Sequence, residues 1–228
     1  MAVDEALLKS AASHGAPALR FYFWSEPALS LGYFQKFADR SAHVLSASCQ
    51  TVRRASGGGA ILHDQELTYS LSWPTANRFA ASADDLYVAI HESLCKTLFN
   101  FGVSATLSTR ETGAEDAPFL CFARRAVGDV LLRHHKIAGS AQRRLKGALL
   151  QHGSVLLSRS PSAPELSGIQ DLTGIQVPVN QFIESWQDLI GERLNLQFVS
   201  VDLTAEECQA ATAILASKFG SIAWLHKR

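Results

Sequence analysis

The sequence predicts one mixed α/β domain, of the α+β type, in which helices flank a largely antiparallel or mixed sheet. Strand-like segments follow one another in runs and do not alternate with helices, which disfavours a doubly wound parallel fold. Two amphipathic segments, 84–101 and 180–194, have the periodicity of helices that cover a sheet. A chain of 228 residues is long enough for one sizeable core. We therefore predict a single domain over 1–228, with 180–228 as a small helical C-terminal part.

The first third of the chain is expected to supply a short helix and several strands. Residues 3–12 predict the helix, and Pro27 is expected to join the first two strands. A run of three glycines, Gly57 to Gly59, forms a loop between the next two strands. Strands are predicted at 18–24, 30–35, 50–55 and 67–73.

The segment 84–101 is the clearest helix in the sequence. Its apolar face is formed by residues that recur every fourth position, Leu86, Ile90, Leu94 and Leu98. Asp84 and Asp85 at its start complement the positive end of the helix dipole. Residues 103–118 are mostly polar and rich in turn formers, so they predict a mobile loop that leads to Cys121.

The second half is predicted to continue the sheet and to end in helices. Lys146 and Gly147 form the expected hairpin turn. The connection 158–179 contains three prolines and several serines. Thr204 and Glu207 have the spacing of a capping box. Strands are predicted at 126–134, 136–143 and 147–157, and helices at 180–194 and 204–219.

Composition indicates an ordinary soluble protein. Hydrophobic residues make up 47% and charged residues 18% of the chain, and the formal net charge is zero, so no nucleic-acid partner is expected. The N-terminus lacks the pattern of a signal peptide, and no apolar run is long enough to span a bilayer, so no membrane partner is expected. The four cysteines are scattered without a CxxC pair, which argues against a disulfide framework and a zinc site. A reduced, cytoplasmic protein without a bound metal is predicted.

The glycine loop is the first candidate for a binding site. Gly57, Gly58 and Gly59 let the backbone approach a ligand closely and direct N–H groups towards it, and Arg54 can place a charge at the mouth of the loop. A tight turn between two strands is the alternative interpretation. Neither a P-loop motif nor a GxGxxG fingerprint is present.

Two histidines, His63 and His152, are further candidates for substrate binding. Neither has a second histidine three or four residues later, so they do not predict a metal site. A histidine that is hydrogen-bonded into the structure is the alternative interpretation.

The segment KIAGSAQ predicts a strand that forms a pocket wall. Because side chains alternate across a strand, its small polar face is expected to contain Lys136, Ala138, Ser140 and Gln142. Gly139 and Gly153 lie on two strands that pair about the predicted hairpin turn, where they leave room for a substrate or a backbone. An edge strand with a solvated lysine is the alternative.

Cys121 is the candidate nucleophile. A thiol attacks as the thiolate, and a neighbouring cation such as Lys136 favours that form. The residue types alone favour a buried core cysteine, since free cysteine is often buried.

Three segments together resemble the lipoate/octanoate protein transferase family, which belongs to the biotin/lipoate protein ligase superfamily. They are RRASGGGAILHDQELTYS at 53–70, the CF pair at 121–122, and KIAGSAQ with LLQHGSVLL within 136–157. The similarity is dense over 18–73 and 119–157. It is greatest to the cysteine-dependent octanoyltransferases that use octanoyl-acyl carrier protein, and it implies a biotin/lipoate protein ligase-like catalytic domain.

The resemblance also implies a reaction and its residues. Cys121 would carry the octanoyl group as a thioester, and Lys136 would stabilise negative charge at the thioester carbonyl. The glycine loop and the KIAGSAQ strand would hold the acyl group. The donor would be acyl carrier protein, and the acceptor would be a lysine of a lipoyl-domain protein such as glycine cleavage H protein. No cofactor is implied, because the thioester donor is already activated.

The chain departs from the family pattern in two places. It starts at Met1 within a segment that a strand normally precedes in the family, so either the start codon is misassigned or that strand is missing, which would leave a sheet edge unpaired. ARRA follows the CF pair where the family has a proline-containing turn.

Two other functions remain open at the level of sequence. An ATP-dependent lipoate–protein ligase would suit the same glycine loop but needs no cysteine, and a non-catalytic protein that binds acyl groups or lipoyl domains would suit the same fold. A basic run, with Asp129 as the only acid within 124–146, predicts either a docking surface for an acidic carrier protein or an ordinary solvated face. Its members are Arg124, Arg125, Arg133, Lys136, Arg143, Arg144 and Lys146.

Overall fold

A six-stranded sheet and a smaller three-stranded sheet form the framework of the protein. The computed structural model describes residues 1–75, 82–111 and 118–228. The large sheet has the strand order β1-β5-β9-β8-β7-β6 and is antiparallel throughout. Its strands are β1 (Ala18–Tyr22), β5 (Glu66–Pro74), β6 (Thr106–Leu107), β7 (Val130–Leu132), β8 (His135–Leu145) and β9 (Ala148–Leu156). The predicted mixed, largely antiparallel fold class is confirmed.

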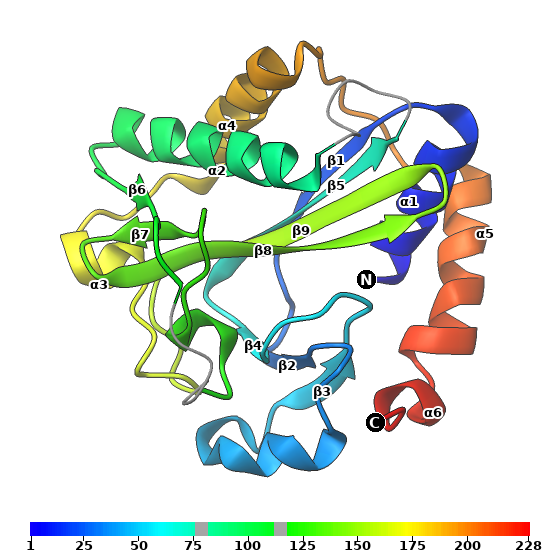
Figure 1. Ribbon diagram of the computed structural model, residues 1–228, viewed down its shortest axis with the longest axis horizontal. Helices are drawn as coiled ribbons and strands as arrows, with labels where there is room; N and C mark the ends of the chain where they lie inside the picture. The colour runs from blue at the N-terminus through cyan, green and yellow to red at the C-terminus, as the bar shows by residue number, and fades with distance from the viewer. Residues whose placement is uncertain (76–81, 112–117) are drawn as a thin grey trace.

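The small sheet lies below the large one in Figure 1 and has the order β3-β2-β4. Its strands are β2 (Ala28–Leu31), β3 (Gln50–Arg53) and β4 (Ile61–His63), and the short helices η1 (Phe37–Ala42) and η2 (Val44–Ser46) connect β2 to β3. β2 pairs in parallel with β3 and antiparallel with β4.

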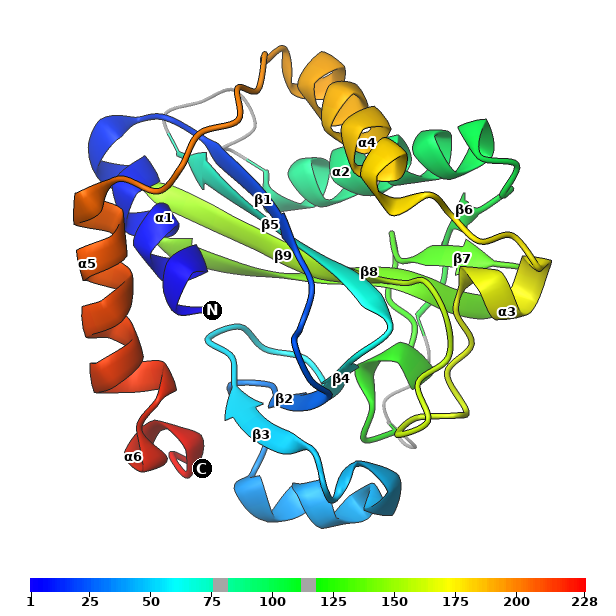
Figure 2. The ribbon, with the colours of Figure 1, turned by 180° about the vertical axis from the view of Figure 1, so that it is seen from behind.

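Helices cover one face of the large sheet and pack at one end of it (Figures 1 and 2). α2 (Ala83–Asn100) and α4 (Val179–Leu194) lie across that face, and α1 (Ala2–His14) packs with α5 (Ala205–Ile214) beside the β8–β9 turn. The remaining helical segments are short: η5 (Cys121–Ala123), α3 (Ile169–Thr173), η6 (Leu215–Phe219) and α6 (Ile222–Leu225). Within the described ranges, none of the helices combines the length and apolar character that crossing a bilayer requires.

The main core lies between the large sheet and the helices α2 and α4. The four apolar residues predicted for the face of α2 are all fully buried there. Phe182 and Trp186 bring α4 into the same core. Within the C-terminal part predicted at 180–228, α4 belongs to the main core and α5 packs on α1.

Several boundaries in the structure differ from the predicted ones. The strand predicted at 30–35 ends at Leu31, because the side chain of Gln35 accepts a hydrogen bond from the Gly32 N–H and the chain turns there. The strand predicted at 126–134 is shortened to Val130–Leu132. The predicted loop 103–118 contains the short strand β6, and its residues 112–117 lie outside the described ranges.

Local signals identified other features correctly. Gly147 has a φ of 92° at the hairpin turn between β8 and β9, a conformation that favours glycine. Thr204 and Glu207 form the predicted capping box of α5.

Trp186 provides a test of the main core. Its side chain is fully buried, packs near Phe21 and Tyr69, and donates a hydrogen bond from Nε1 to Ser93 Oγ. We expect Trp186→Ala to lower the free energy of unfolding by about 3 to 5 kcal/mol, measured by urea denaturation. Phe99→Ala is the control, because Phe99 is 69% exposed on the neighbouring helix. A similar loss in both variants would contradict this description of the core.

Candidate active site

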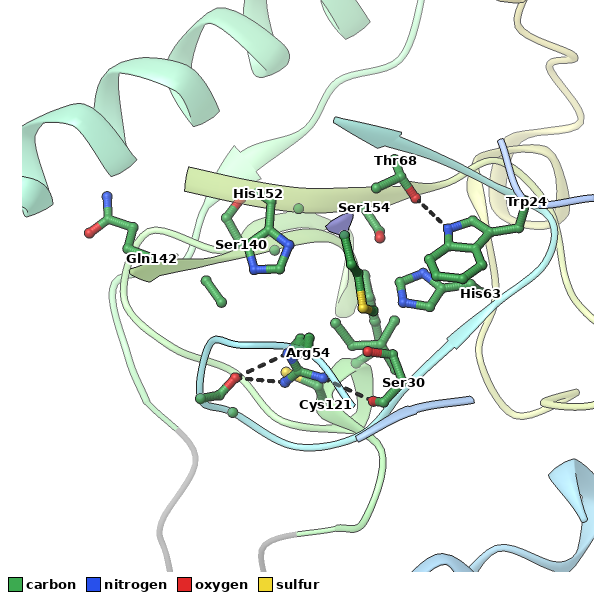
Figure 3. A pocket seen from close by; sticks show the side chains of 18 of the residues that line it. Trp24, Ser30, Arg54, His63, Thr68, Cys121, Ser140, Gln142, His152 and Ser154 are labelled. Atoms are coloured by element: carbon green, nitrogen blue, oxygen red, sulfur yellow. Dashed lines mark hydrogen bonds between the residues drawn. The ribbon is translucent and has the colours of Figure 1, made fainter. Parts of the chain in front are cut away.

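A cavity of about 260 Å³ lies between the two sheets, on the face of the large sheet opposite α2 and α4. All the predicted site residues except Gly59 line it. Figure 3 shows Arg54 and Cys121 on one side of this space, and Ser140, His152 and Ser154 on the large sheet across from them. The three sequence segments that carried the resemblance therefore all contribute residues to one cavity.

Cys121 is held against the glycine loop by its own backbone. Its N–H donates to the carbonyl of Ala60 at 2.7 Å, and the Ala60 N–H donates to the carbonyl of Phe119 at 3.0 Å. A Cβ at Gly59 would lie 3.2 Å from both the N and the Cα of Cys121. Glycine at this position therefore brings the cysteine segment close to the loop and places its thiol in the cavity. This is the role of Gly59, although it does not line the cavity.

Arg54 supports the glycine loop from beneath. Its guanidinium donates to the carbonyls of Gly57 at 2.7 Å and Gly59 at 2.6 Å, and to the carbonyl of Ser30 at 2.9 Å (Figure 3). The side chain is buried, which lowers the pKa of Arg54 to about 10, while nearby Cys121 acts in the opposite direction. Arg54 thus stays charged at neutral pH. Arg54 also lines the cavity.

Lys136 lies between the thiol and a buried carboxylate. Its Nζ is 4.0 Å from Cys121 Sγ and 2.8 Å from Asp129 Oδ2. Asp129 is 1% exposed and also accepts hydrogen bonds from the Ala126 N–H at 2.6 Å and the Tyr87 hydroxyl at 2.8 Å. These bonds fix the carboxylate, and the carboxylate in turn fixes the lysine beside the thiol. The solvated edge lysine considered as an alternative is therefore wrong.

Gly139 provides the space that the Lys136 side chain occupies. A Cβ at Gly139 would lie 2.4 Å from Cε and 2.7 Å from Nζ of Lys136. The pairing of β7 with β8 shifts register between Val130 and Leu131, and both Ile137 and Ala138 lie in the main core. The strict alternation predicted for KIAGSAQ is therefore broken by a bulge, which brings Lys136 over Gly139 on the cavity side.

The polar side chains of β8 beyond this bulge bond towards the helix-covered side. Ser140 Oγ lies 2.7 Å from His91 Nε2 and 2.6 Å from the Tyr69 hydroxyl. Gln142 Nε2 donates to the carbonyl of Ala83 at the start of α2. Gly153 makes room for this packing, since a Cβ there would lie 2.3 Å from Ser140 Oγ. The space that the two predicted glycines provide is thus filled by protein side chains.

Both predicted histidines line the cavity and are bonded into its walls. His152 Nε2 lies 2.5 Å from Ser56 Oγ, and burial lowers the pKa of His152 to about 4, so it is neutral near pH 7. His63 Nδ1 lies 2.5 Å from Glu66 Oε1, and its ring stacks on Trp24 with centroids 4.2 Å apart. The described residues hold no group of three or more histidine, cysteine, aspartate or glutamate side chains placed to bind a metal ion.

Sequence reasoning missed three residues that shape the site: Asp129, Tyr87 and Trp24. Asp129 was visible as the one acid in a basic run, which is the pattern expected of a counter-ion. Tyr87 and Trp24 carried no such signal, because their partners are distant in sequence.

The basic run within 124–146 does not form one continuous surface. Lys136 is buried in the site, and Arg143 donates to the carbonyl of Ala55 beside the glycine loop at 2.8 Å. Arg124 donates to the carbonyl of Pro118 at 2.6 Å, and Arg125 to that of His134. In Figure 1 the β8–β9 turn and the segment after Cys121 lie at opposite ends of the molecule. The proposed single docking surface is therefore divided.

The architecture is that of the lipoate–protein ligase type of catalytic domain. The structure of Ta0514, a putative lipoate protein ligase from T. acidophilum, superposes with a TM-score of 0.81 at 21% identity, over 100% of this chain and 92% of that one. A lipoate-protein ligase A bound with ATP superposes with a TM-score of 0.80 at 22% identity, over 99% of this chain and 92% of the other. These likenesses establish the fold.

The chain belongs to the lipoyl protein ligase A/B catalytic domain family, whose model matches residues 1–188. Similar sequences include Octanoyltransferase LipM of Macrococcus caseolyticus, 33% identical over 100% of this chain and 94% of the relative. Octanoyltransferase LipM of Carboxydothermus hydrogenoformans is 28% identical over 100% of this chain and 93% of the relative. The family resemblance predicted from the sequence is confirmed.

His91 gives a prediction about pH. Its side chain is fully buried between the Gly128 carbonyl and Ser140, and burial lowers the pKa of His91 to about 4. The unfolded chain takes up a proton near pH 6.5 that the folded chain does not accept, so the protein should lose stability as pH falls from about 6.5 to 4. The contribution of His91 is about 3 kcal/mol at the lower limit.

The measurement is the free energy of unfolding as a function of pH. The slope of this curve reports how many more protons the unfolded chain binds than the folded one. We expect His91→Gln to reduce that number by about one over this pH window, whereas His134→Gln, at an exposed position, leaves it unchanged. An unaltered slope in the His91 variant would contradict the assignment of a neutral, buried imidazole.

Proposed function

We propose that this protein is an octanoyltransferase that carries the octanoyl group on Cys121. The donor is octanoyl-acyl carrier protein, and the acceptor is a lysine amine of a lipoyl-domain protein, such as glycine cleavage H protein. The observation that carries the proposal is the position of the Cys121 thiol, inside the cavity and 4.0 Å from Lys136 Nζ. The relatives named Octanoyltransferase LipM support the same activity.

In the first half-reaction the Cys121 thiolate attacks the carbonyl carbon of the donor thioester. The carbonyl oxygen becomes an oxyanion, and the Lys136 ammonium donates a hydrogen bond to it. When this intermediate collapses, the bond to the donor sulfur breaks, and the donor leaves as a thiolate that takes up a proton. The product is a new thioester on Cys121. No ATP is consumed, because one thioester replaces another.

In the second half-reaction the neutral acceptor amine attacks the thioester on Cys121. The C–N bond forms, the C–S bond breaks, and the proton lost by the amine restores the Cys121 thiol. The octanoyl group leaves as an amide. Lys136 stabilises the oxyanion of this step as well, since the carbonyl carbon stays attached to the same sulfur until the bond breaks.

Asp129 acts as a positioning residue in this scheme. It does not line the cavity but pairs with Lys136 Nζ at 2.8 Å. A lysine with four flexible carbons would otherwise sample many positions, so a fixed counter-ion preorganises the charge beside the thiol.

The reaction also fits a reducing compartment. All four cysteines are free in the structure, and thiols stay reduced in the cytoplasm. We therefore place the protein in the cytoplasm, together with its carrier and acceptor proteins.

The first prediction concerns the acyl-enzyme. Incubation with octanoyl-acyl carrier protein without ATP should add one octanoyl group to the wild-type chain, detected by intact-protein mass spectrometry and released by hydroxylamine. Cys121→Ser should gain no such group, whereas Cys208→Ser, at an exposed position, should be modified like the wild type. If the acceptor is modified only after ATP and free octanoate are added, the chain is a ligase and this proposal is wrong.

The second prediction tests whether Asp129 acts by positioning Lys136. Lys136→Met should slow single-turnover acylation by about 10² to 10³-fold, as expected when an oxyanion donor is removed. Asp129→Asn should also slow it. Because Asp129 acts through Lys136, the double variant should be no slower than Lys136→Met alone. Asp84→Asn, at an exposed position, is the control. Losses that multiply in the double variant would contradict the positioning role.

A further inference from the structure

An exposed aromatic side chain lies beside the glycine loop, close to the thiol. Phe34, in the turn after β2, is 68% exposed, and a Cβ at Gly57 would lie 3.7 Å from its ring. Gly58 is exposed as well, and a Cβ there would lie 3.9 Å from Cys121 Sγ. Both glycines line the cavity. Only the short glycine loop therefore separates Phe34 from the thiol.

The C-terminal segment 224–228 packs onto the turn that carries this side chain. The Phe37 N–H donates to the carbonyl of Arg228 at 2.9 Å, and Lys227 Nζ donates to the Tyr33 hydroxyl at 2.7 Å. In both ribbon views α6 lies beside β3 of the small sheet (Figures 1 and 2). Two segments that are far apart in the sequence thus form one continuous surface next to the glycine loop.

This surface carries an excess of positive charge. The guanidinium of Arg228 lies over the Phe34 ring, 5.4 Å from its centre. Asp39 is the only acidic side chain within 33–40 and 224–228, which together hold four lysine and arginine residues. The formal net charge of the whole chain is zero, so the excess is local. We call Phe34, Lys36, Arg40, Lys227 and Arg228 the basic surface.

The cations of the basic surface are available to a partner. Among the described residues, none of the four forms an ion pair with a carboxylate. Lys36, Lys227 and Arg228 are exposed. Arg40 donates to the carbonyl of Ala47 at 3.0 Å. Because neutral groups such as rings and carbonyls leave the positive charge unbalanced, the surface suits a partner that presents several carboxylates.

The position of the basic surface decides which of the two proposed partners fits it. A partner docked there must reach Cys121 across the glycine loop. A carrier protein presents its thioester on a long, flexible arm, whereas an acceptor amine extends only by a lysine side chain from its own backbone. A docked carrier can therefore load the thiol, and the acceptor needs a closer approach to the cavity.

We propose that the basic surface docks the acidic carrier protein that donates the octanoyl group. The inference rests on the proposed acyl transfer and names the surface that recognises the donor. Acidic side chains of the carrier meet the four cations, and Phe34 packs against an apolar side chain among them. The arm passes the exposed Gly58 into the cavity, where Cys121 takes over the octanoyl group and the carrier leaves as its free thiol. Charge complementarity of this kind speeds association and fixes the orientation of the partner.

The experiment compares a protein donor with a small one. Loading of Cys121 is followed by intact-protein mass with octanoyl-acyl carrier protein and with octanoyl-pantetheine, which presents the same thioester without the protein. The double variant Lys227→Glu/Arg228→Glu reverses two charges of the basic surface, and Phe34→Ala removes its apolar centre. Lys9→Glu/Lys96→Glu is the matched control, because its two lysines are exposed on α1 and α2 and lie outside the basic surface.

We expect the double variant to lower kcat/KM for the carrier donor by about tenfold or more, mainly through KM, and to match the wild type with octanoyl-pantetheine. Phe34→Ala should act in the same direction, and the control should leave both donors unchanged. Circular dichroism confirms that each variant is folded. Equal losses with the two donors, or a folded double variant with unaltered carrier kinetics, would overturn the inference.

The acceptor step is measured separately. With Cys121 loaded beforehand from octanoyl-pantetheine, transfer to the lipoyl-domain protein should proceed in the double variant at the wild-type rate. A loss confined to this step would assign the basic surface to the acceptor, and the inference would be wrong.

Failure of the proposed function has a different signature. If the wild type loads Cys121 from neither donor, acyl transfer through this residue is wrong, and fluorescence anisotropy with labelled acyl carrier protein then tests the basic surface by itself. Weaker binding by the double variant than by the control variant would support the docking surface, and equal binding would overturn it.

Discussion

The site depends on backbone contacts that leave no room for a Cβ atom. A Cβ at Gly32 would lie 2.0 Å from the carbonyl oxygen of Gly58, and one at Gly59 would lie 3.1 Å from the carbonyl oxygen of Phe119. Glycine at these positions lets the turn after β2, the glycine loop and the segment before Cys121 pack against one another. Arg54 then joins the loop to β2 by donating hydrogen bonds to the carbonyl oxygens of Gly57, Gly59 and Ser30. The position of the thiol follows from this packing.

Charge around the thiol is arranged before any substrate arrives. Lys136 and Arg54 are both buried close to Cys121, and Asp129 holds Lys136 from behind. Buried charges of this kind are retained only when they are paired or hydrogen-bonded, and here each one is. Because the donors are already in place, stabilising an oxyanion requires little reorganisation at the moment of reaction. This preorganisation is the physical basis of the proposed acyl transfer.

Much of the fold could be predicted because its signals are local. The apolar periodicity of α2, the Lys146–Gly147 turn and the Thr204–Glu207 capping box each depend on residues a few positions apart. The candidate site was predictable as a set of residues, because three sequence segments matched a family pattern.

The arrangement of the site could not be predicted in the same way. The bulge in β8 arises from pairing with β7, so alternation assigned Lys136 and Gly139 to opposite faces. The hydrogen bonds of Tyr87 to Asp129 and of Trp24 to Thr68 each join residues more than 40 positions apart. The glycines were expected to make room for a substrate, and only the packed structure shows that side chains such as Lys136 fill the space.

The most direct test of the central claim is a crystal structure of the chain with an octanoyl group trapped on Cys121. The account predicts that the thioester oxygen lies within hydrogen-bond distance of Lys136 Nζ and that the alkyl chain lies in the cavity between the two sheets. An oxygen that faces away from Lys136, or an alkyl chain that lies outside the cavity, would contradict it.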